Sequence, residues 1–145
     1  MIALVQRVAE ANVSVDNETV SSIGEGMLIL LGIKKGDTEE KSKRLAERCV
    51  YLRIFEDAQG KFNHSLKDIG GSALVVSQFT LLADTSCGRR PSFTDAEEPQ
   101  KSKHFYDIFA RSLSTCGITT KTGSFGKRML VKLVNNGPVT IILEE

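Results

Sequence analysis

The pattern of hydrophobic and polar positions predicts a chain that begins with strands. Ile2–Val8 alternates loosely and is rich in β-formers, and the alternation continues to Val15. Asp16-Asn17 is a turn signal, and Glu18–Ile23 follows it as a returning strand. Met27–Ile33 is a nearly continuous apolar run bounded by glycines. Such a run indicates a strand that is buried on both faces.

Two helices are predicted from apolar residues at helical spacing. Asp37 is the expected N-cap of the first helix, and Glu40 three residues later completes a capping-box pattern. The second helix is expected over Lys101–Cys116 and to end at Gly117. The apolar stripes are Leu45, Ala46, Cys49 and Val50 in the first helix, and Phe105, Ile108, Phe109, Leu113 and Cys116 in the second.

The remaining apolar runs complete a mixed pattern of strands and helices. A long surface loop is expected over Asp84–Pro99, because it carries Gly88, Pro91 and Pro99. The further strands are expected at Leu52–Phe55, Ala73–Val76 (running on through Leu81), Ile118–Lys121, Met129–Val134 and Val139–Leu143. The fold class is therefore α/β: a single mixed α/β domain over residues 1–145, mostly β-sheet and barrel-like, with two main helices.

Composition and charge exclude several classes of protein. The net charge is +1, so any nucleic-acid binding must rest on local positive charge. Three widely spaced cysteines without a CxxC pair indicate reduced thiols in a cytoplasmic protein. The two histidines lie 40 positions apart, at residues 64 and 104, so no metal site is expected. The start lacks the order of a signal peptide, and no apolar run is long enough to span a membrane.

A glycine-proline pair near the end of the chain is the first candidate for function. Gly137-Pro138 lies between two β-like runs. Glycine lacks the Cβ that restricts approach, and the X-Pro bond is the one peptide bond that is cis at modest cost. The pair therefore suits a surface of exposed main-chain carbonyls that distinguishes how groups are arranged around a tetrahedral carbon. A simple loop between strands is the alternative.

A second candidate follows the buried strand that ends near Val76. Ser77-Gln78-Phe79-Thr80 brings two hydroxyls and an amide to a strand end, where they line a pocket or serve as ordinary strand residues. No Gly-x-Ser-x-Gly elbow surrounds Ser77, and nothing local ties His64 or His104 to it. A serine nucleophile with a histidine base is therefore not expected.

Arginines give two further candidates. Arg89 and Arg90 share a loop with Phe93, a combination that suits phosphate and a stacked base, or simply a solvated loop. Arg7 stands in an apolar strand, where it either faces solvent at an edge or binds a main-chain carbonyl. The glycine-framed segment Gly123–Met129 lacks the Gly-Lys-Ser/Thr order of a nucleotide triphosphate loop.

Taken together, these segments resemble D-aminoacyl-tRNA deacylase over essentially the whole chain. The motifs that carry the resemblance are Val5-Gln6-Arg7-Val8, Leu52-Arg53-Ile54-Phe55, Ser77-Gln78-Phe79-Thr80-Leu81, Gly88-Arg89-Arg90-Pro91-Ser92-Phe93-Thr94-Asp95 and Asn135-Asn136-Gly137-Pro138-Val139-Thr140. Each motif is weak alone, and the combination is specific.

The resemblance implies a homodimeric cytoplasmic enzyme without metal or cofactor. It would hydrolyse the ester between a D-amino acid and the 3′-terminal adenosine of tRNA, and would also remove glycine mischarged on tRNA(Ala). The site would lie at the dimer interface. Gly137-Pro138 would be cis and enter the partner's pocket, where its carbonyls reject an L side chain. Arg7 would brace the pair, with Asn135 and Thr140 in support. A related group of deacylases has the pair in trans.

The resemblance also assigns the remaining site residues. The tRNA 2′-hydroxyl would activate the attacking water, with Ser77, Gln78, Phe79 and Thr80 as the catalytic segment that holds the carbonyl. The adenosine and tRNA contacts would come from Phe79, Phe125, Met129, Arg89 and Arg90. One departure is Lys127, which stands where the family usually has a small residue. The alternatives are a non-catalytic module that binds aminoacyl-tRNA and a serine esterase that uses Ser77.

Overall fold

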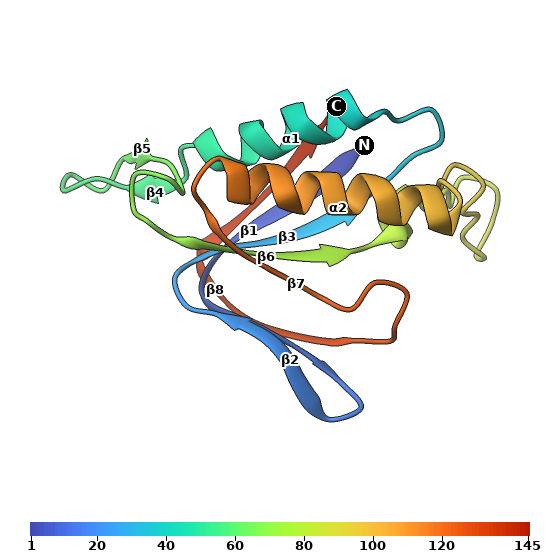
Figure 1. Cartoon of the computed structure of the whole chain (residues 1–145), viewed down its shortest axis with the longest axis horizontal. Coiled ribbons are helices and arrows are strands. Elements are labelled where there is room, and N and C mark those ends of the chain that lie inside the picture. The colour runs from blue at the N-terminus through green and yellow to red at the C-terminus, as the bar shows by residue number, and fades with distance from the viewer.

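One long strand organises the sheet. In the computed structural model, which describes residues 1–145, β1 (Ile2–Val15) pairs antiparallel with three other strands. Its first half pairs with β3 (Gly26–Gly32) and its second half with β2 (Glu18–Ile23). The strand β8 (Leu130–Glu144) runs along the other edge of β1 over both halves. The N- and C-termini therefore lie close together (Figure 1).

Two parallel strands extend the sheet beyond β3. The strand order is β2-β1-β3-β6-β7, with β8 attached to β1. β6 (Ser72–Ser77) pairs parallel with β3, and β7 (Thr119–Thr122) pairs parallel with β6. Each parallel connection needs a crossover, and the two helices provide them. α1 (Glu39–Tyr51) precedes β6, and α2 (Pro99–Thr115) precedes β7.

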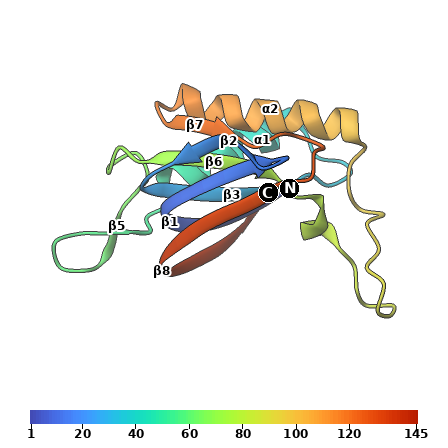
Figure 2. The ribbon, with the colours of Figure 1, turned by 90° about the horizontal axis from the view of Figure 1, so that it is seen from below.

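The helices cover one face of the sheet, and the sheet curls on its other side. Figures 1 and 2 show α1 and α2 side by side over the strands, with β2 turned back beneath β6 and β7. A core of 24 buried residues lies between helices and sheet and includes both predicted helical stripes except the half-buried Cys116. A second cluster of seven buried residues, among them Val8, Leu28 and Val76, fills the inside of the curl. This arrangement confirms the predicted mixed α/β fold with a barrel-like sheet.

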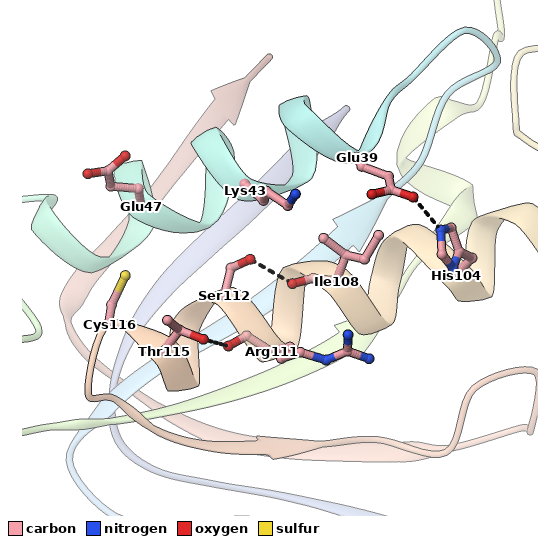
Figure 3. A pocket seen from close by; sticks show the side chains of 9 residues that line it. All are labelled: Glu39, Lys43, Glu47, His104, Ile108, Arg111, Ser112, Thr115 and Cys116. Atoms are coloured by element: carbon pink, nitrogen blue, oxygen red, sulfur yellow. Dashed lines mark hydrogen bonds and ion pairs between the residues drawn. The ribbon is translucent and has the colours of Figure 1, made fainter.

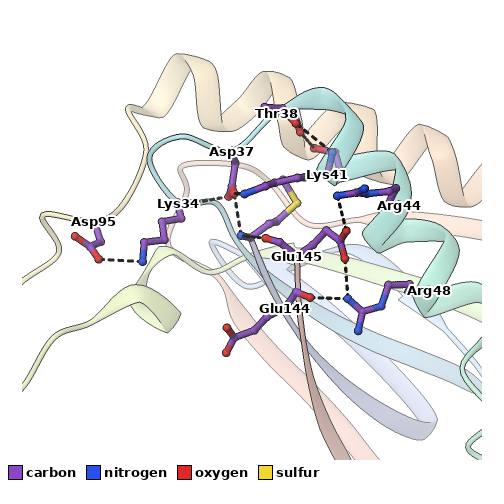
Figure 4. Close-up of polar contacts among 11 residues, drawn as sticks. Lys34, Asp37, Thr38, Lys41, Arg44, Arg48, Asp95, Glu144 and Glu145 are labelled. Atoms are coloured by element: carbon purple, nitrogen blue, oxygen red, sulfur yellow. Dashed lines mark hydrogen bonds and ion pairs between the residues drawn. The ribbon is translucent and has the colours of Figure 1, made fainter.

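The start of α1 differs from the prediction. Thr38, not Asp37, is the N-cap, and its hydroxyl accepts a hydrogen bond from the Lys41 N–H at 3.3 Å. The Asp37 carboxylate is buried and binds the Met1 amino group at 2.9 Å and the Lys34 N–H at 2.7 Å (Figure 4). Partners 3 and 36 residues away thus occupy the carboxylate, and Thr38 caps the helix instead. The capping box with Glu40 is not formed.

The strand predictions need three corrections. The two runs expected at Met129–Val134 and Val139–Leu143 are one strand, β8, which continues through Gly137-Pro138. The strand expected at Leu52–Phe55 is only β4 (Phe55–Glu56), and it pairs with the unpredicted β5 (Phe62–His64). The segment after Ser77 leaves the sheet and forms a 3₁₀ helix, η1 (Phe79–Leu82). Neither α1 nor α2 has the length and the apolar composition of a membrane-spanning helix.

Candidate functional site

The pocket that gathers most of the predicted catalytic segment lies where the parallel strands β6 and β7 end. In open α/β sheets, ligands bind beyond the carboxyl ends of the parallel strands, and this pocket lies at such ends. The pocket has a volume of about 620 Å³, within the range of small-molecule sites. Its walls come from the end of β6, η1, the loop before α2 with the first turn of that helix, and the segment between β7 and β8. Three separate parts of the chain, residues 76–79, 93–102 and 125–131, therefore converge on one cavity.

Aromatic and thioether groups line much of this pocket. Phe79 is 55% exposed, and its ring contacts the Phe93 ring edge-to-face with 5.1 Å between centroids. The Phe125 ring packs on Tyr106 at 5.5 Å. The lining residues named by sequence analysis are Ser77, Gln78, Phe79, Phe93, Phe125, Lys127 and Met129. Flat apolar groups around an open cavity suit a planar ring such as a nucleobase.

Main-chain donors stand free beside the pocket. The N–H groups of Phe79 and Thr80 begin η1 and have no acceptor within the chain, because the bonds of this segment start with the Leu81 N–H to the Gln78 carbonyl. The Gln78 side-chain amide donates to the Thr80 hydroxyl and so fixes the start of the turn. Two free, adjacent N–H groups are suited to hold an oxygen that acquires negative charge.

No histidine lies in this pocket. His104 is exposed on α2, and its ring binds the Glu39 carboxylate at 2.8 Å in a separate groove between α1 and α2 (Figure 3). That hydrogen bond lowers the pKa of Glu39 below its ordinary value. In the same groove the hydroxyls of Ser112 and Thr115 donate back to carbonyls of their own helix. The groove therefore presents no convergent catalytic groups, and Ser77 has no histidine base.

Sequence analysis missed two acidic residues of the pocket, Glu97 and Glu98. Glu97 lines the cavity, and its carboxylate accepts hydrogen bonds from the Lys101 ammonium at 2.9 Å and from the Glu98 N–H at 3.0 Å. The Lys101 bond, followed by the main-chain bond, lowers the pKa of Glu97. The i,i+4 spacing to Lys101 was the available signal, but it is typical of any helix surface. Glu97 is ionised and already paired, which makes it a poor base.

The second group of predicted residues surrounds Gly137-Pro138. Gln6 pairs with Thr140 and Val8 with Asn135, so residues 136–139 of β8 bulge opposite Arg7. The Gly137-Pro138 peptide bond is cis, as the resemblance implies. Both residues are exposed at the surface of the bulge. Gly137 has φ +140°, a backbone conformation that L side chains rarely adopt.

Arg7 is buried beneath this bulge and binds main-chain oxygens. Its side chain is only 6% exposed. Nε donates to the Asn136 carbonyl and Nη1 to the Ile54 carbonyl, each at 2.7 Å. Of the two environments considered for Arg7, the structure shows the buried one with carbonyl partners. The hydrogen bonds to these carbonyls therefore offset the cost of burying the guanidinium, and one of them holds the bulge from below.

Asn135 closes the bulge from the side. Its Oδ1 accepts a hydrogen bond from the Val139 N–H at 2.7 Å, and its Nδ2 donates to the Thr140 hydroxyl at 3.1 Å and the Val139 carbonyl at 3.3 Å. The Thr140 hydroxyl also accepts from the Gln6 amide at 3.2 Å. The residues named as supports, Arg7, Asn135 and Thr140, thus all contact the bulge or its immediate flank.

The pocket and the Gly137-Pro138 bulge are separate in one chain. On β3, Met27 pairs with Arg7 and Leu31 pairs with Ser77. Four residues along a strand and two strand spacings across give roughly 16 Å between Arg7 and Ser77. The bulge lies one strand further away, and none of its residues lines the pocket. Figure 1 shows the bend of β8 and the end of β6 at opposite ends of the sheet.

Unpaired cations lie near the pocket. Arg89 and Arg90 belong to the loop that contributes Phe93, and Lys127 and Arg128 belong to the segment that contributes Phe125. All four are exposed, and none forms an ion pair. Lys127 lines the cavity, whereas Arg89 and Arg90 do not. Exposed, unpaired cations on both sides of a cavity suit a polyanionic ligand.

The chain is similar to known proteins over almost its whole length. A model of the D-Tyr-tRNA(Tyr) deacylase family matches residues 4–144. Over 144 residues the chain is 56% identical to a D-aminoacyl-tRNA deacylase of Roseiflexus sp. (strain RS-1), covering 99% of this chain and 93% of that protein. A D-aminoacyl-tRNA deacylase of Thermomicrobium roseum is 54% identical over 99% of this chain and 94% of its own length.

Two solved structures share the fold. The structure of a c-Myc DNA unwinding element binding protein is 39% identical with a TM-score of 0.93, covering 100% of this chain and 99% of that one. A probable eukaryotic D-amino acid tRNA deacylase has a TM-score of 0.84 at 17% identity, covering 98% of this chain and 97% of that one. The latter similarity concerns the fold alone.

Proposed function

Because the chain belongs to the D-Tyr-tRNA(Tyr) deacylase family and is a hydrolase of D-aminoacyl-tRNA, we propose how its two groups of residues divide the work. The pocket at the end of β6 holds the 3′ end of the aminoacylated tRNA and its ester. The Gly137-Pro138 bulge screens the amino acid by its shape.

The pocket accommodates the terminal adenosine. The exposed Phe79 ring offers a stacking surface, and a base stacked on an aromatic ring gains about 1–3 kcal/mol. Phe125 and Met129 form the wall from the other side. Arg89 and Arg90 have no acidic partner in the chain and are available to the phosphates that precede the adenosine. The aminoacyl ester then lies near the start of η1.

Hydrolysis proceeds without a side-chain nucleophile. A water molecule attacks the ester carbonyl carbon, assisted by the 2′-hydroxyl of the terminal ribose. The free N–H groups of Phe79 and Thr80 hold the oxygen that becomes negative. The bond to the ribose 3′-oxygen then breaks, a proton passes to that oxygen, and the products are a free D-amino acid and tRNA. Ser77 and Gln78 line the pocket and position the substrate.

The bulge excludes L-amino acids by contact with their side chains. Gly137 and Pro138 present exposed backbone without a Cβ at the glycine, and Arg7 and Asn135 hold that backbone in place. A wall of this kind rejects a side chain on one side of the α-carbon and leaves the other side free. Glycine has no side chain to reject, so glycine mischarged on tRNA(Ala) is also a substrate.

A second copy of the chain completes the site. Since the bulge and the pocket lie too far apart within one chain, the bulge reaches the pocket of a partner. An exposed apolar row on β8 favours such an association, because Leu130, Val134 and Ile142 are 56, 51 and 59% exposed. The protein is accordingly a homodimer with the site at the interface. It acts in the cytoplasm, where aminoacyl-tRNA is used.

The observation that carries the chemistry is the pair of free N–H groups in a pocket without histidine. Ser77→Ala and Thr80→Ala variants should therefore keep part of their activity on D-Tyr-tRNA. A substrate whose terminal ribose is 2′-deoxy should lose activity with the wild-type enzyme. Complete loss in Ser77→Ala, with the 2′-deoxy substrate fully active, would instead support a serine esterase. Tight tRNA binding that protects the ester would support a non-catalytic binding module.

A further inference from the structure

The guanidinium that supports the bulge is itself held by the β4–β5 hairpin. Nη2 of Arg7 lies 3.3 Å from the Glu56 carboxylate on β4. The Phe62 ring on β5 lies against the same guanidinium, with 5.1 Å between Arg7 Cζ and the ring centroid. Glu56 and Phe62 pair with each other across the hairpin. The hairpin therefore contacts Arg7 through an ion pair and a cation–π contact at once.

These contacts fix where the arginine can point. An arginine side chain has several rotatable bonds, and a single hydrogen bond leaves much of their freedom. Here three groups outside the bulge hold the guanidinium in place: the Ile54 carbonyl, the Glu56 carboxylate and the Phe62 ring. Its Nε then donates to the Asn136 carbonyl at 2.7 Å. The hairpin and the bulge thus bind the same guanidinium.

The hairpin is built to be stiff. The Asp57 carboxylate accepts hydrogen bonds from the N–H groups of Gln59 at 2.8 Å and Lys61 at 2.9 Å, and from the Asn63 side chain. The Asp57 N–H donates to the Lys61 carbonyl at 2.8 Å. Gly60, with φ +74°, provides the left-handed residue of the turn. The hydrogen bond from the Lys61 N–H is the largest cause that lowers the pKa of Asp57. The Asp57 carboxylate is therefore ionised at neutral pH and keeps its hydrogen bonds within the turn.

We propose that Phe62 and Glu56 are positioning residues that set the Gly137-Pro138 bulge against L-amino acids through Arg7. This inference rests on the proposed function, because it assumes that the bulge performs the screening. The close approach of bulge and arginine supports it: a Cβ at Gly137 would lie 2.9 Å from Nη2 of Arg7. The backbone that meets the substrate therefore packs directly on the guanidinium that the hairpin holds.

The test compares D-Tyr-tRNA and L-Tyr-tRNA deacylation in hairpin variants. Loss of an exposed cation–π contact or ion pair corresponds to about a two- to five-fold effect. Phe62→Ala and Glu56→Ala should each raise kcat/KM for L-Tyr-tRNA by that factor and leave kcat/KM for D-Tyr-tRNA unchanged. The double variant should raise it by about five- to twenty-fold. Phe62→Tyr retains the ring face and should restore wild-type selectivity.

A matched control is available on α1. Tyr51 is 50% exposed and lies beneath the Lys67 ammonium at 5.6 Å, a contact like that of Phe62 but away from Arg7. Tyr51→Ala should leave both rates unchanged. Phe62→Leu, which keeps bulk and removes the ring, should behave as Phe62→Ala. Thermal unfolding of every variant accompanies the kinetics.

The outcomes separate this inference from the function on which it rests. If Phe62→Ala and Glu56→Ala keep the wild-type ratio of D to L rates while Gly137→Ala changes it, the hairpin inference is wrong and the screening role of the bulge stands. An equal fall for both substrates would also overturn the inference, since the hairpin would then act on folding or tRNA binding. If the wild-type enzyme does not discriminate, the proposed function itself fails.

Discussion

Replacing Gly137 with alanine tests whether the bulge must keep its present backbone. The new Cβ would meet Cγ2 of Val139 at 2.7 Å, Nη2 of Arg7 at 2.9 Å and the Val139 nitrogen at 3.1 Å. Contacts below 3.0 Å force a shift, and Arg7 cannot move freely because carbonyls hold it. The bulge is exposed, so it moves instead. We expect displaced carbonyls and a loss of discrimination against L-Tyr-tRNA.

The cost can be estimated from two terms. A strained backbone conformation costs about 1–3 kcal/mol, and overpacking adds about 1–3 kcal/mol. Because an exposed bulge relaxes, we take the lower part of the sum, about 2–3 kcal/mol. For a chain of 145 residues, each kcal/mol lowers Tm by about 2–4 °C. The expected decrease in Tm is therefore about 5–10 °C.

Two other glycines are suitable controls. A Cβ on Gly24 meets nothing within 4 Å and the residue has no unusual φ, so Gly24→Ala should be neutral. Gly117 has φ +89° but open space around it, so Gly117→Ala reports the backbone cost alone. Thermal unfolding and paired D- and L-Tyr-tRNA deacylation are measured for all three. A Gly137→Ala enzyme with the Tm of Gly24→Ala and unchanged selectivity would show that neither stability nor screening requires glycine at this position.

Three further expectations follow from the surface and the core. Arg89→Ala or Arg90→Ala should weaken tRNA binding and lower the salt dependence of log Kd by about one unit of slope each; an unchanged slope would remove that arginine from the interface. Burial raises the pKa of the Cys49 thiol from about 9 to about 12, so native protein should alkylate at the exposed Cys87 and spare Cys49. Because the raised pKa keeps Cys49 protonated when the unfolded chain ionises, stability should fall with pH above about 9, and less steeply in Cys49→Ala. Denaturant titrations at pH 8 and pH 10 measure the free energy of unfolding of both proteins. An equal decrease between the two pH values in wild type and Cys49→Ala would contradict this expectation.

The sequence predicted elements well where burial imposes a regular period. Met27–Ile33 and Ala73–Val76 were recognised because both faces of those strands are covered, by the helices on one side and the curl of the sheet on the other. Glu18–Ile23 was bounded correctly because Asp16-Asn17 is a turn signal, and both residues do have positive φ. Local chemistry and burial pointed to the same answer in these segments.

Predictions failed where distant partners override local preference. Asp37 is a good N-cap by type, but the Met1 amino group, far away in sequence, occupies its carboxylate. The Gly137-Pro138 pair marks a strand end locally, yet pairing with β1 on both sides of the bulge continues β8 through it. β5 is exposed at every residue, so no hydrophobic period signalled it. Its contact with Arg7 was therefore invisible in the sequence.

The sequence predicted the residues of the candidate site but not how they are arranged in space. Ser77, Phe79, Phe125 and Met129 were named from motifs, and the structure brings them to one pocket. Their convergence requires the parallel pairing of β6 with β7, which no local pattern reveals. The separation of the pocket from Gly137 is likewise a property of strand register. It is this separation that makes a second chain part of the proposed site.

A deacylation time course on paired D-Tyr-tRNA and L-Tyr-tRNA would show both whether the protein hydrolyses the ester and whether it rejects the L-amino acid. We expect rapid loss of the D ester while the L ester stays intact, since only the L side chain meets the Gly137-Pro138 bulge. Loss of both esters at similar rates would contradict the screening role of the bulge. Persistence of both esters with tight tRNA binding would contradict catalysis and favour a binding module.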